Sequence, residues 1–253
     1  MEIIVSRDAR ELGENAAVRI ADRINAAIAD HGLARIVLST GASQLTMLDA
    51  LIQKKVDWSH VEMYHLDEYV GLPETHIASF RKYLKERFIS KVPLGAAHLV
   101  DGTAEGIGAL TASLRSAPID IGLIGIGENG HIAFNDPPAD FDTREAYIIV
   151  NLNDTCKHQQ VREGWFASVE EVPAQAVSMT VHQILQCRTI ISVVPYAVKA
   201  DAVQKTLYQD ANNLVPATVM KSHPDFTLFV DRDSFAGVDV ERIRPEGVPV
   251  RIL

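Results

Sequence analysis

The residues best suited to chemistry stand in two polar segments that lie far apart in the chain. Asp67 and Glu68 follow an apolar run, and His131 follows Gly130 in a glycine-rich stretch. A carboxylate that is buried in a pocket can have its pKa raised toward neutrality and serve as a general base. An imidazole titrates near neutral pH and can move a second proton. These residue types predict acid–base catalysis, and the alternative for Asp67 and Glu68 is a pair of solvated turn carboxylates.

His131 has two polar neighbours in the sequence that can orient its ring. Asn129 precedes it, and Asp136 follows it just before Pro137. A partner on one ring nitrogen decides which nitrogen faces a ligand. A lone histidine is usually packed or solvated, but a histidine between glycine turns with such neighbours favours a functional role.

A third segment, residues 39–44, is small and rich in hydroxyl groups. It runs into a helix expected to begin near Leu45, so its backbone N–H groups and the positive end of the helix dipole could bind an anion. The alternative is an ordinary turn with Ser43 as the helix cap, and the segment alone leaves both interpretations open. It contains neither a Gly-Lys-Ser/Thr sequence nor GxGxxG, so nucleotide binding has no support. The candidate anion-binding residues are Thr40, Gly41, Ala42, Ser43 and Gln44.

Short runs of apolar, often β-branched residues alternate with longer amphipathic segments. The runs predict strands at residues 3–5, 36–38, 61–66, 119–126, 190–194 and 226–230. Such alternation predicts an α/β fold with a mostly parallel sheet that helices cover on both faces. In such folds ligands bind where loops leave the carboxyl ends of the strands, and all three polar segments stand there.

Capping signals mark the expected helices. Asp8 with Glu11 resembles a capping box, and Gly32 is expected to end the helix that follows. Ser79 can cap another helix, and a late one is expected over residues 199–207. The inward residues are predicted to be Leu12, Ala16, Ile20, Ile24 and Ile28 in the first helix, Leu45, Leu48 and Ile52 in the second, and Phe80, Tyr83, Leu84 and Phe88 in the third.

The composition limits the classes of function. Lys and Arg number 24 against 33 Asp and Glu, and a net charge of −9 without a basic stripe argues against nucleic acid as a partner. No apolar run approaches a membrane span or a signal peptide, so we expect a cytoplasmic protein with no membrane partner. Cys156 and Cys187 are then expected to be free thiols. We find no linker or internal repeat and predict a single domain over residues 1–253.

Taken together, the three loops resemble the glucosamine-6-phosphate deaminase (isomerase) family. The similar stretches are LSTGAS, HLDEYVGLPETHIASF and GIGENGHIAFNDP, followed by VPAQAVSMTV and IISVVPYAVKA. The resemblance runs in order from about residue 35 to 231. It implies a Rossmann-like, doubly wound fold and a reaction without cofactor or metal, in which glucosamine 6-phosphate and water give fructose 6-phosphate and ammonia. Members of the family are often homo-oligomers, so an oligomer is an open expectation here.

The resemblance also implies residue roles. Asp67 falls on the base that moves a proton between C2 and C1, and His131 on the residue that opens the sugar ring. Asn129 and Asp136 fall on the positions that support that histidine. Residues 41–44 fall on the phosphate loop, and Lys199 falls on a lysine that reaches the phosphate.

Three departures from the family pattern affect these roles. Asn129 stands where members have Asp or Asn, and Asp136 stands where Glu is usual. The family's phosphate-binding arginine precedes two aromatic residues, whereas here two residues separate Arg162 from Trp165 and Phe166. Arg162 is therefore a weaker candidate for phosphate binding. Gln159 and Gln160 are weaker candidates for contacts with the sugar, and Trp165 and Phe166 are expected to pack rather than stack on a ligand.

Other functions remain as alternatives. The same fold could act on another hexosamine phosphate, such as galactosamine 6-phosphate, or hydrolyse a lactone as 6-phosphogluconolactonases do. A lactonase needs no enolising carboxylate, so Asp67 in its Asp-Glu-Tyr-Val-Gly-Leu setting argues against it. A non-enzymatic sugar-phosphate sensor would need an appended DNA-binding unit with a basic face, for which this acidic chain leaves no room. The remaining histidines show no metal-ligand spacing, and we interpret them as structural or solvated.

Overall fold

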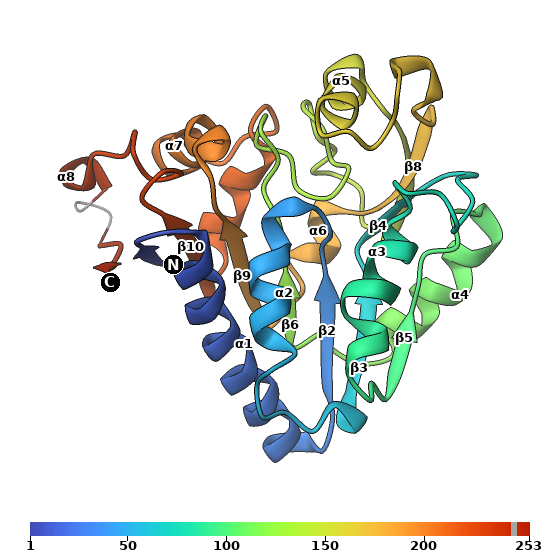
Figure 1. Ribbon diagram of the computed structural model, residues 1–253, viewed down its shortest axis with the longest axis horizontal. Helices are drawn as coiled ribbons and strands as arrows, with labels where there is room; N and C mark the ends of the chain where they lie inside the picture. The colour runs from blue at the N-terminus through green and yellow to red at the C-terminus, as the bar shows by residue number, and fades with distance from the viewer. Residues whose placement is uncertain (244–246) are drawn as a thin grey trace.

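An eight-stranded parallel sheet forms the centre of the protein in a computed structural model, which describes residues 1–243 and 247–253, with the backbone alone at residues 104 and 155. Every pair of neighbouring strands is parallel. In spatial order the strands are β11 (Val250–Ile252), β1 (Glu2–Ser6), β10 (Phe226–Asp231), β9 (Thr189–Val194), β6 (Ile121–Leu123), β2 (Ala34–Leu38), β3 (Val61–His65) and β5 (Ala96–His98). N- and C-terminal strands thus pair at one edge, and the two ends of the chain lie close together (Figure 1).

Helices cover both faces of this sheet. One face packs against α1 (Ala9–His31), α2 (Leu45–Leu51) and α3 (Phe80–Arg87), and the other against α4 (Ala104–Arg115), α6 (Val181–Ile184) and α7 (Ala200–Tyr208). Alternate residues of each strand serve the two faces, so Ile36 and Leu38 join the α1 side whereas Val37 joins the α4 side. The helices α1 and α4 thus pack on opposite faces of the sheet. The fold is the predicted doubly wound, Rossmann-like α/β architecture.

Local signals in the sequence explain the long first helix. The Asp8 carboxylate accepts a hydrogen bond from Glu11 N at 2.9 Å, and Glu11 accepts one from Arg7 N at 2.6 Å. Gly32 ends the helix in the left-handed conformation, with φ of 82°, which glycine adopts without strain. Ile20 and Ile24 are fully buried against the sheet. The capping box and the stop signal are therefore confirmed.

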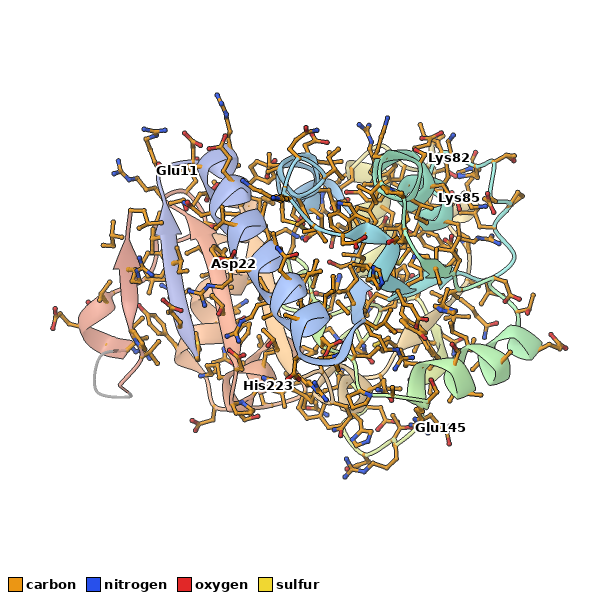
Figure 2. All side chains as sticks on the ribbon, turned by 90° about the horizontal axis from the view of Figure 1, so that it is seen from below. Glu11, Asp22, Lys82, Lys85, Glu145 and His223 are labelled. Atoms are coloured by element: carbon orange, nitrogen blue, oxygen red, sulfur yellow. The ribbon has the colours of Figure 1, made fainter. Side chains whose placement is uncertain are left out.

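Charged side chains occupy the outer faces of these helices. Lys82 and Lys85 project from α3 at the periphery of the molecule (Figure 2), where Lys82 pairs with Glu86 and Lys85 with Glu74. Exposed pairs of this kind contribute little to stability. No helix of the described residues is long and apolar enough to span a membrane.

A small antiparallel sheet that the sequence did not predict lies beyond the carboxyl ends of the parallel strands. It consists of β4 (Asp67–Tyr69), β8 (Gln175–Met179) and β7 (Tyr147–Asn151), and α5 (Asp154–Arg162) lies at the same end of the molecule (Figure 1). Asp67 pairs with Ser178 in its register. The chain therefore passes from the parallel sheet into the antiparallel sheet at Leu66. The short α8 (Val240–Ile243) completes the fold near the C-terminus.

Three predicted elements differ in detail. The run at residues 119–126 forms a strand only at Ile121–Leu123, because the chain beyond it turns toward the loop after β2, where Gly125 N donates to Ser39 Oγ. In α2 the buried residues are Met47, Leu48 and Leu51, whereas Leu45 and Ile52 are only partly buried. A 3-10 turn at Ala42–Gln44 precedes this helix and sets its phase. Another 3-10 turn, Ala197–Lys199, precedes α7, so that helix begins at Ala200 and not at Lys199.

We expect Ile24→Ala to lower the free energy of unfolding by about 2–5 kcal/mol, because it leaves a cavity between α1 and the sheet. Val18→Ala on the exposed side of the same helix should change it by about 0.5 kcal/mol or less. Urea denaturation of both variants measures the difference. Equal losses would contradict the burial pattern of α1.

Candidate active site

A pocket opens at the carboxyl ends of β2, β3, β6 and β9. It is lined by residues 39–43 after β2, residues 66–67 after β3, residues 125–128 after β6, and Tyr196, Val198 and Lys199 after β9. His131, Ala133 and Phe134 add to one wall, and Gln159, Gln160, Glu163 and Trp165 add a wall from α5 and the residues after it. The connections that leave β2 and β6 run in opposite directions along the sheet. In doubly wound folds, ligands usually bind at the point where the connections diverge in this way.

Asp67 is a buried carboxylic acid in this pocket. Its side chain is 6% exposed, and burial, together with the nearby charge of Glu68, raises its pKa to about 8. The Leu66 carbonyl accepts a hydrogen bond from Met179 N at 2.9 Å, which ties the start of β4 to β8. A carboxyl group whose pKa lies near the working pH can both accept and return a proton.

Glu68 points away from the pocket and anchors the segment that carries Asp67. Its carboxylate accepts hydrogen bonds from the backbone N–H groups of Tyr69, Phe80 and Arg81, from Ser79 Oγ and from Arg81 Nε, at 2.8–3.2 Å. Fully buried, it thus binds the start of α3 to β4. This explains structurally why two adjacent carboxylates follow one strand.

His131 forms a contact network with the two residues predicted to orient it. Its Nδ1 lies 3.0 Å from Asp136 Oδ1, and Asn129 Nδ2 donates to the same oxygen at 3.1 Å. Asn129 Oδ1 in turn accepts from His131 N at 3.0 Å. Burial would raise the pKa of Asp136, but its contacts with His131, Asn129 and Cys156 outweigh burial and lower it. Nδ1 is buried and faces Asp136 at ion-pair distance without an aligned hydrogen bond, so Nε2 is the ring nitrogen left for a ligand.

Gly127 allows the imidazole to lie against the backbone. A Cβ atom at this position would stand 2.3–2.5 Å from three atoms of the His131 ring, closer than side chains approach one another. The glycine between β6 and the histidine is therefore needed for the present position of the ring. Ala133, two residues beyond His131, has φ of 52°, a conformation that non-glycine residues rarely adopt.

The pocket also carries groups suited to an anion. Thr40, Gly41, Ala42 and Ser43 line it, and Tyr83 Oη donates to the Gly41 carbonyl at 2.9 Å, which holds the turn in place. Lys199 reaches the pocket from the turn before α7 and is only 9% exposed. Burial lowers its pKa, while Glu163 and Glu128 act in the opposite direction.

Four of the site residues proposed from the sequence do not line the pocket. The Gln44 amide is buried and donates to Ser43 Oγ and the Val193 carbonyl, at 2.9 and 3.1 Å. Arg162 is exposed and pairs with Glu128 at 2.8 Å. Asn129 and Asp136 stand behind His131 and do not line the pocket.

The pocket also contains residues that sequence reasoning missed or placed elsewhere. Glu128, Glu163 and Tyr196 line it, and Trp165 lines it as well, although packing was expected for that side chain. Phe166 does pack, with its ring centroid 5.5 Å from that of Tyr69. The weaker candidates Gln159 and Gln160 both line the pocket. Among the described residues, no group of three or more His, Cys, Asp or Glu side chains could hold a metal ion.

Comparison with known proteins shows the family of this chain. The family model described as glucosamine-6-phosphate isomerases/6-phosphogluconolactonase matches residues 7–228. The chain belongs to this family. The glucosamine-6-phosphate deaminase of Staphylococcus epidermidis is 34% identical over 243 residues, which cover 91% of this chain and 97% of that protein. The glucosamine-6-phosphate deaminase of Bacillus cytotoxicus is 30% identical over 240 residues, covering 93% and 88%.

Solved structures show the same fold. A monomeric glucosamine-6-phosphate deaminase superposes with a TM-score of 0.84 at 27% identity, covering 93% of this chain and 99% of that one. The 6-phosphogluconolactonase from Trypanosoma brucei gives a TM-score of 0.74 at 16% identity, covering 94% and 98%. At that identity the second likeness concerns the fold alone.

The raised pKa of Asp67 predicts a pH-dependent cost in stability. Between about pH 4 and pH 8 the unfolded chain has released the Asp67 proton whereas the folded protein keeps it, so stability falls as the pH rises through this window. Asp67→Asn removes that cost. We expect the variant to gain up to about 1.4 kcal/mol over the wild type for each pH unit, levelling off above pH 8.

Urea denaturation at pH 5, 6.5 and 8 measures this gain. Asp49→Asn, at an exposed position of α2, is the control and should show no such trend. A gain for Asp67→Asn that does not change with pH would contradict the assigned burial effect.

Proposed function

We propose that this protein is an amino-sugar-phosphate isomerase and deaminase, which converts glucosamine 6-phosphate and water to fructose 6-phosphate and ammonia. The observation that carries the proposal is that Asp67 and His131, from loops far apart in the chain, line one pocket together with a small hydroxyl-rich turn and a buried lysine. The names of the relatives support the same reaction. We further propose a cytoplasmic enzyme that requires no cofactor or metal and has neither nucleic acid nor membrane as a partner, and the two free, buried cysteines are consistent with that compartment.

The proposed chemistry needs two proton-transfer groups. His131 would take the proton of the anomeric hydroxyl through Nε2 and return one to the ring oxygen, which opens the pyranose. Asp67 would then remove the C2 proton while the carbonyl oxygen at C1 takes up a proton, which gives an enolamine. Return of the proton from Asp67 to C1 and loss of one proton from the amino group leave a hydroxyl group at C1 and an imine at C2. Water adds to that imine and ammonia leaves, giving the ketose. Each of the two groups contributes on the order of 10²–10⁴ in rate.

The phosphate would serve as a handle at the other end of the substrate. In this proposal the backbone N–H groups of residues 40–43, with the hydroxyls of Thr40 and Ser43 and the Lys199 ammonium, bind it. Binding energy gained there orients C1 and C2 over Asp67. Asn129 and Asp136 would hold the ring of His131 with Nε2 toward the sugar. Gln44 and Arg162 do not belong to this set, because the Gln44 amide is buried against Val193 and Arg162 pairs with Glu128.

The proposal is tested by ammonia release from glucosamine 6-phosphate, followed by detection of fructose 6-phosphate. Galactosamine 6-phosphate and 6-phosphogluconolactone serve as the competing substrates. We expect ammonia from the glucosamine derivative at the highest kcat/KM. Higher kcat/KM with galactosamine 6-phosphate would change the substrate within the same reaction class. Lactone hydrolysis without ammonia from either amino sugar would contradict the proposal.

Asp67→Asn should lower kcat by about 10²–10⁴ and leave substrate affinity nearly unchanged, because the amide cannot take the C2 proton. In the wild type, kcat/KM should rise with pH toward about 8, as the free enzyme's Asp67 ionises. Steady-state kinetics from pH 5.5 to 9 and equilibrium binding of substrate to the variant measure both effects. Turnover by Asp67→Asn close to that of the wild type would exclude Asp67 as the base.

Gly127→Ala should displace the imidazole from Asp136 and slow ring opening, because the added methyl group occupies the place of the ring. We expect kcat to fall at least about tenfold. An open-chain analogue of the substrate that cannot close its ring bypasses the ring-opening step. The variant should therefore turn over this analogue at much of the wild-type rate. A variant equally impaired on both forms of the substrate would show that His131 does not act in ring opening.

A further inference from the structure

Glu163 lines the pocket at an exposed position at the end of α5, where two hydrogen bonds orient its carboxylate. It caps the end of α5, Gln159 Nε2 donates to its Oε1 at 2.7 Å, and Trp165 Nε1 donates to its Oε2 at 3.0 Å. An amide and an indole are neutral donors, so they orient the carboxylate without cancelling its charge. This residue has no role in the acid–base steps described above.

Of the charged groups that line the pocket, Glu163 and Lys199 lack an ion-pair partner among the described residues. Glu128 in the same pocket pairs with Arg162 at 2.8 Å. Asp67 keeps its proton at neutral pH, since its pKa is about 8. Among the described residues no cation lies within ion-pair distance of Glu163, although Lys199 is near enough that Glu163 acts to raise its pKa. The pocket therefore presents one buried ammonium and one exposed carboxylate that do not form an ion pair with each other.

We infer that Glu163 binds the ammonium group of the substrate and makes the pocket select amino sugar phosphates over sugar phosphates with a hydroxyl at the same carbon. The inference rests on the proposed function, because the substrate of that reaction carries one cation and one dianion. Lys199 and the turn at residues 40–43 match the dianion, and Glu163 matches the cation. The aromatic ring of Trp165 and the amides of Gln159 and Gln160 surround this place with groups that suit a polar sugar.

The experiment compares the affinities of wild type and Glu163→Gln for two probes, glucosamine 6-phosphate and glucose 6-phosphate, by calorimetry under conditions of slow turnover. We expect the wild type to prefer the amino sugar about tenfold, the strength of a hydrogen bond to a charged group in a partly exposed site. Glu163→Gln should lose most of that preference and keep its affinity for glucose 6-phosphate. Glu163→Ala, which has neither the carboxylate of the wild type nor the amide of Glu163→Gln, should behave in the same way.

Glu171→Gln is the matched control, because it removes the same charge from an exposed position eight residues further on that does not line the pocket. It should keep the full preference. The inference is overturned if the wild type shows no preference, if both Glu163 variants retain it, or if Glu171→Gln loses as much. It is also overturned if both variants bind the two probes more tightly to the same degree, since Glu163 would then act by repelling the phosphate.

The two proposals fail in different ways. A wild type that prefers the amino sugar but releases no ammonia would refute the reaction and leave amine recognition standing. Ammonia release with an unchanged preference in both Glu163 variants would refute amine recognition and leave the reaction standing. Circular dichroism spectra and thermal melts establish that each variant is folded before its affinities are compared.

Discussion

The structure of the site depends on the burial of the Asp67 carboxyl group where two sheets meet. The parallel strand β3 ends at His65, and the antiparallel strand β4 begins at Asp67, so a single residue separates the two pairing schemes. Hydrogen bonds fix this junction on both sides, from Leu66 N to the Leu38 carbonyl at 3.3 Å and from Met179 N to the Leu66 carbonyl at 2.9 Å. The carboxyl group is thus held under the second sheet, away from water, and its raised pKa follows from that position.

The contacts of Glu68 keep the Asp67 carboxyl group in its buried position. The Glu68 carboxylate accepts hydrogen bonds from five donor groups and so holds the start of α3 against β4, which leaves Asp67 little freedom to turn toward solvent.

Ala133 and Tyr196 both line the pocket, and both have positive φ, at 52° and 80°. Strained backbone of this kind persists where surrounding contacts determine it and is concentrated at functional sites. Here the Tyr196 backbone is held by a hydrogen bond to Asp231 at 3.0 Å.

The large elements were predictable because their signals are local. The strands β1, β2, β3, β9 and β10 are short segments rich in apolar residues, and the cap of α1 at Asp8 needs only residues within one helical turn. The antiparallel sheet was missed for the opposite reason. β4 is three residues long and pairs with β8, more than a hundred positions away, so no short window of sequence contains both partners. The phase of α2 was misjudged because the 3-10 turn before it shifts which side faces the sheet.

By itself the sequence determined the chemical groups and the loops that carry them: a carboxylate after one strand, a histidine between glycines with Asn129 and Asp136 beside it, and a hydroxyl-rich turn before a helix. These are properties of neighbouring residues. Which side chains share the pocket was decided by the tertiary structure. It turns Gln44 into the core, pairs the exposed Arg162 with Glu128 of the lining, and brings Glu163 and Trp165 to the wall. The proton affinity of Asp67 was decided in the same way, because desolvation depends on what is packed around a carboxyl group and not on its neighbours in the chain.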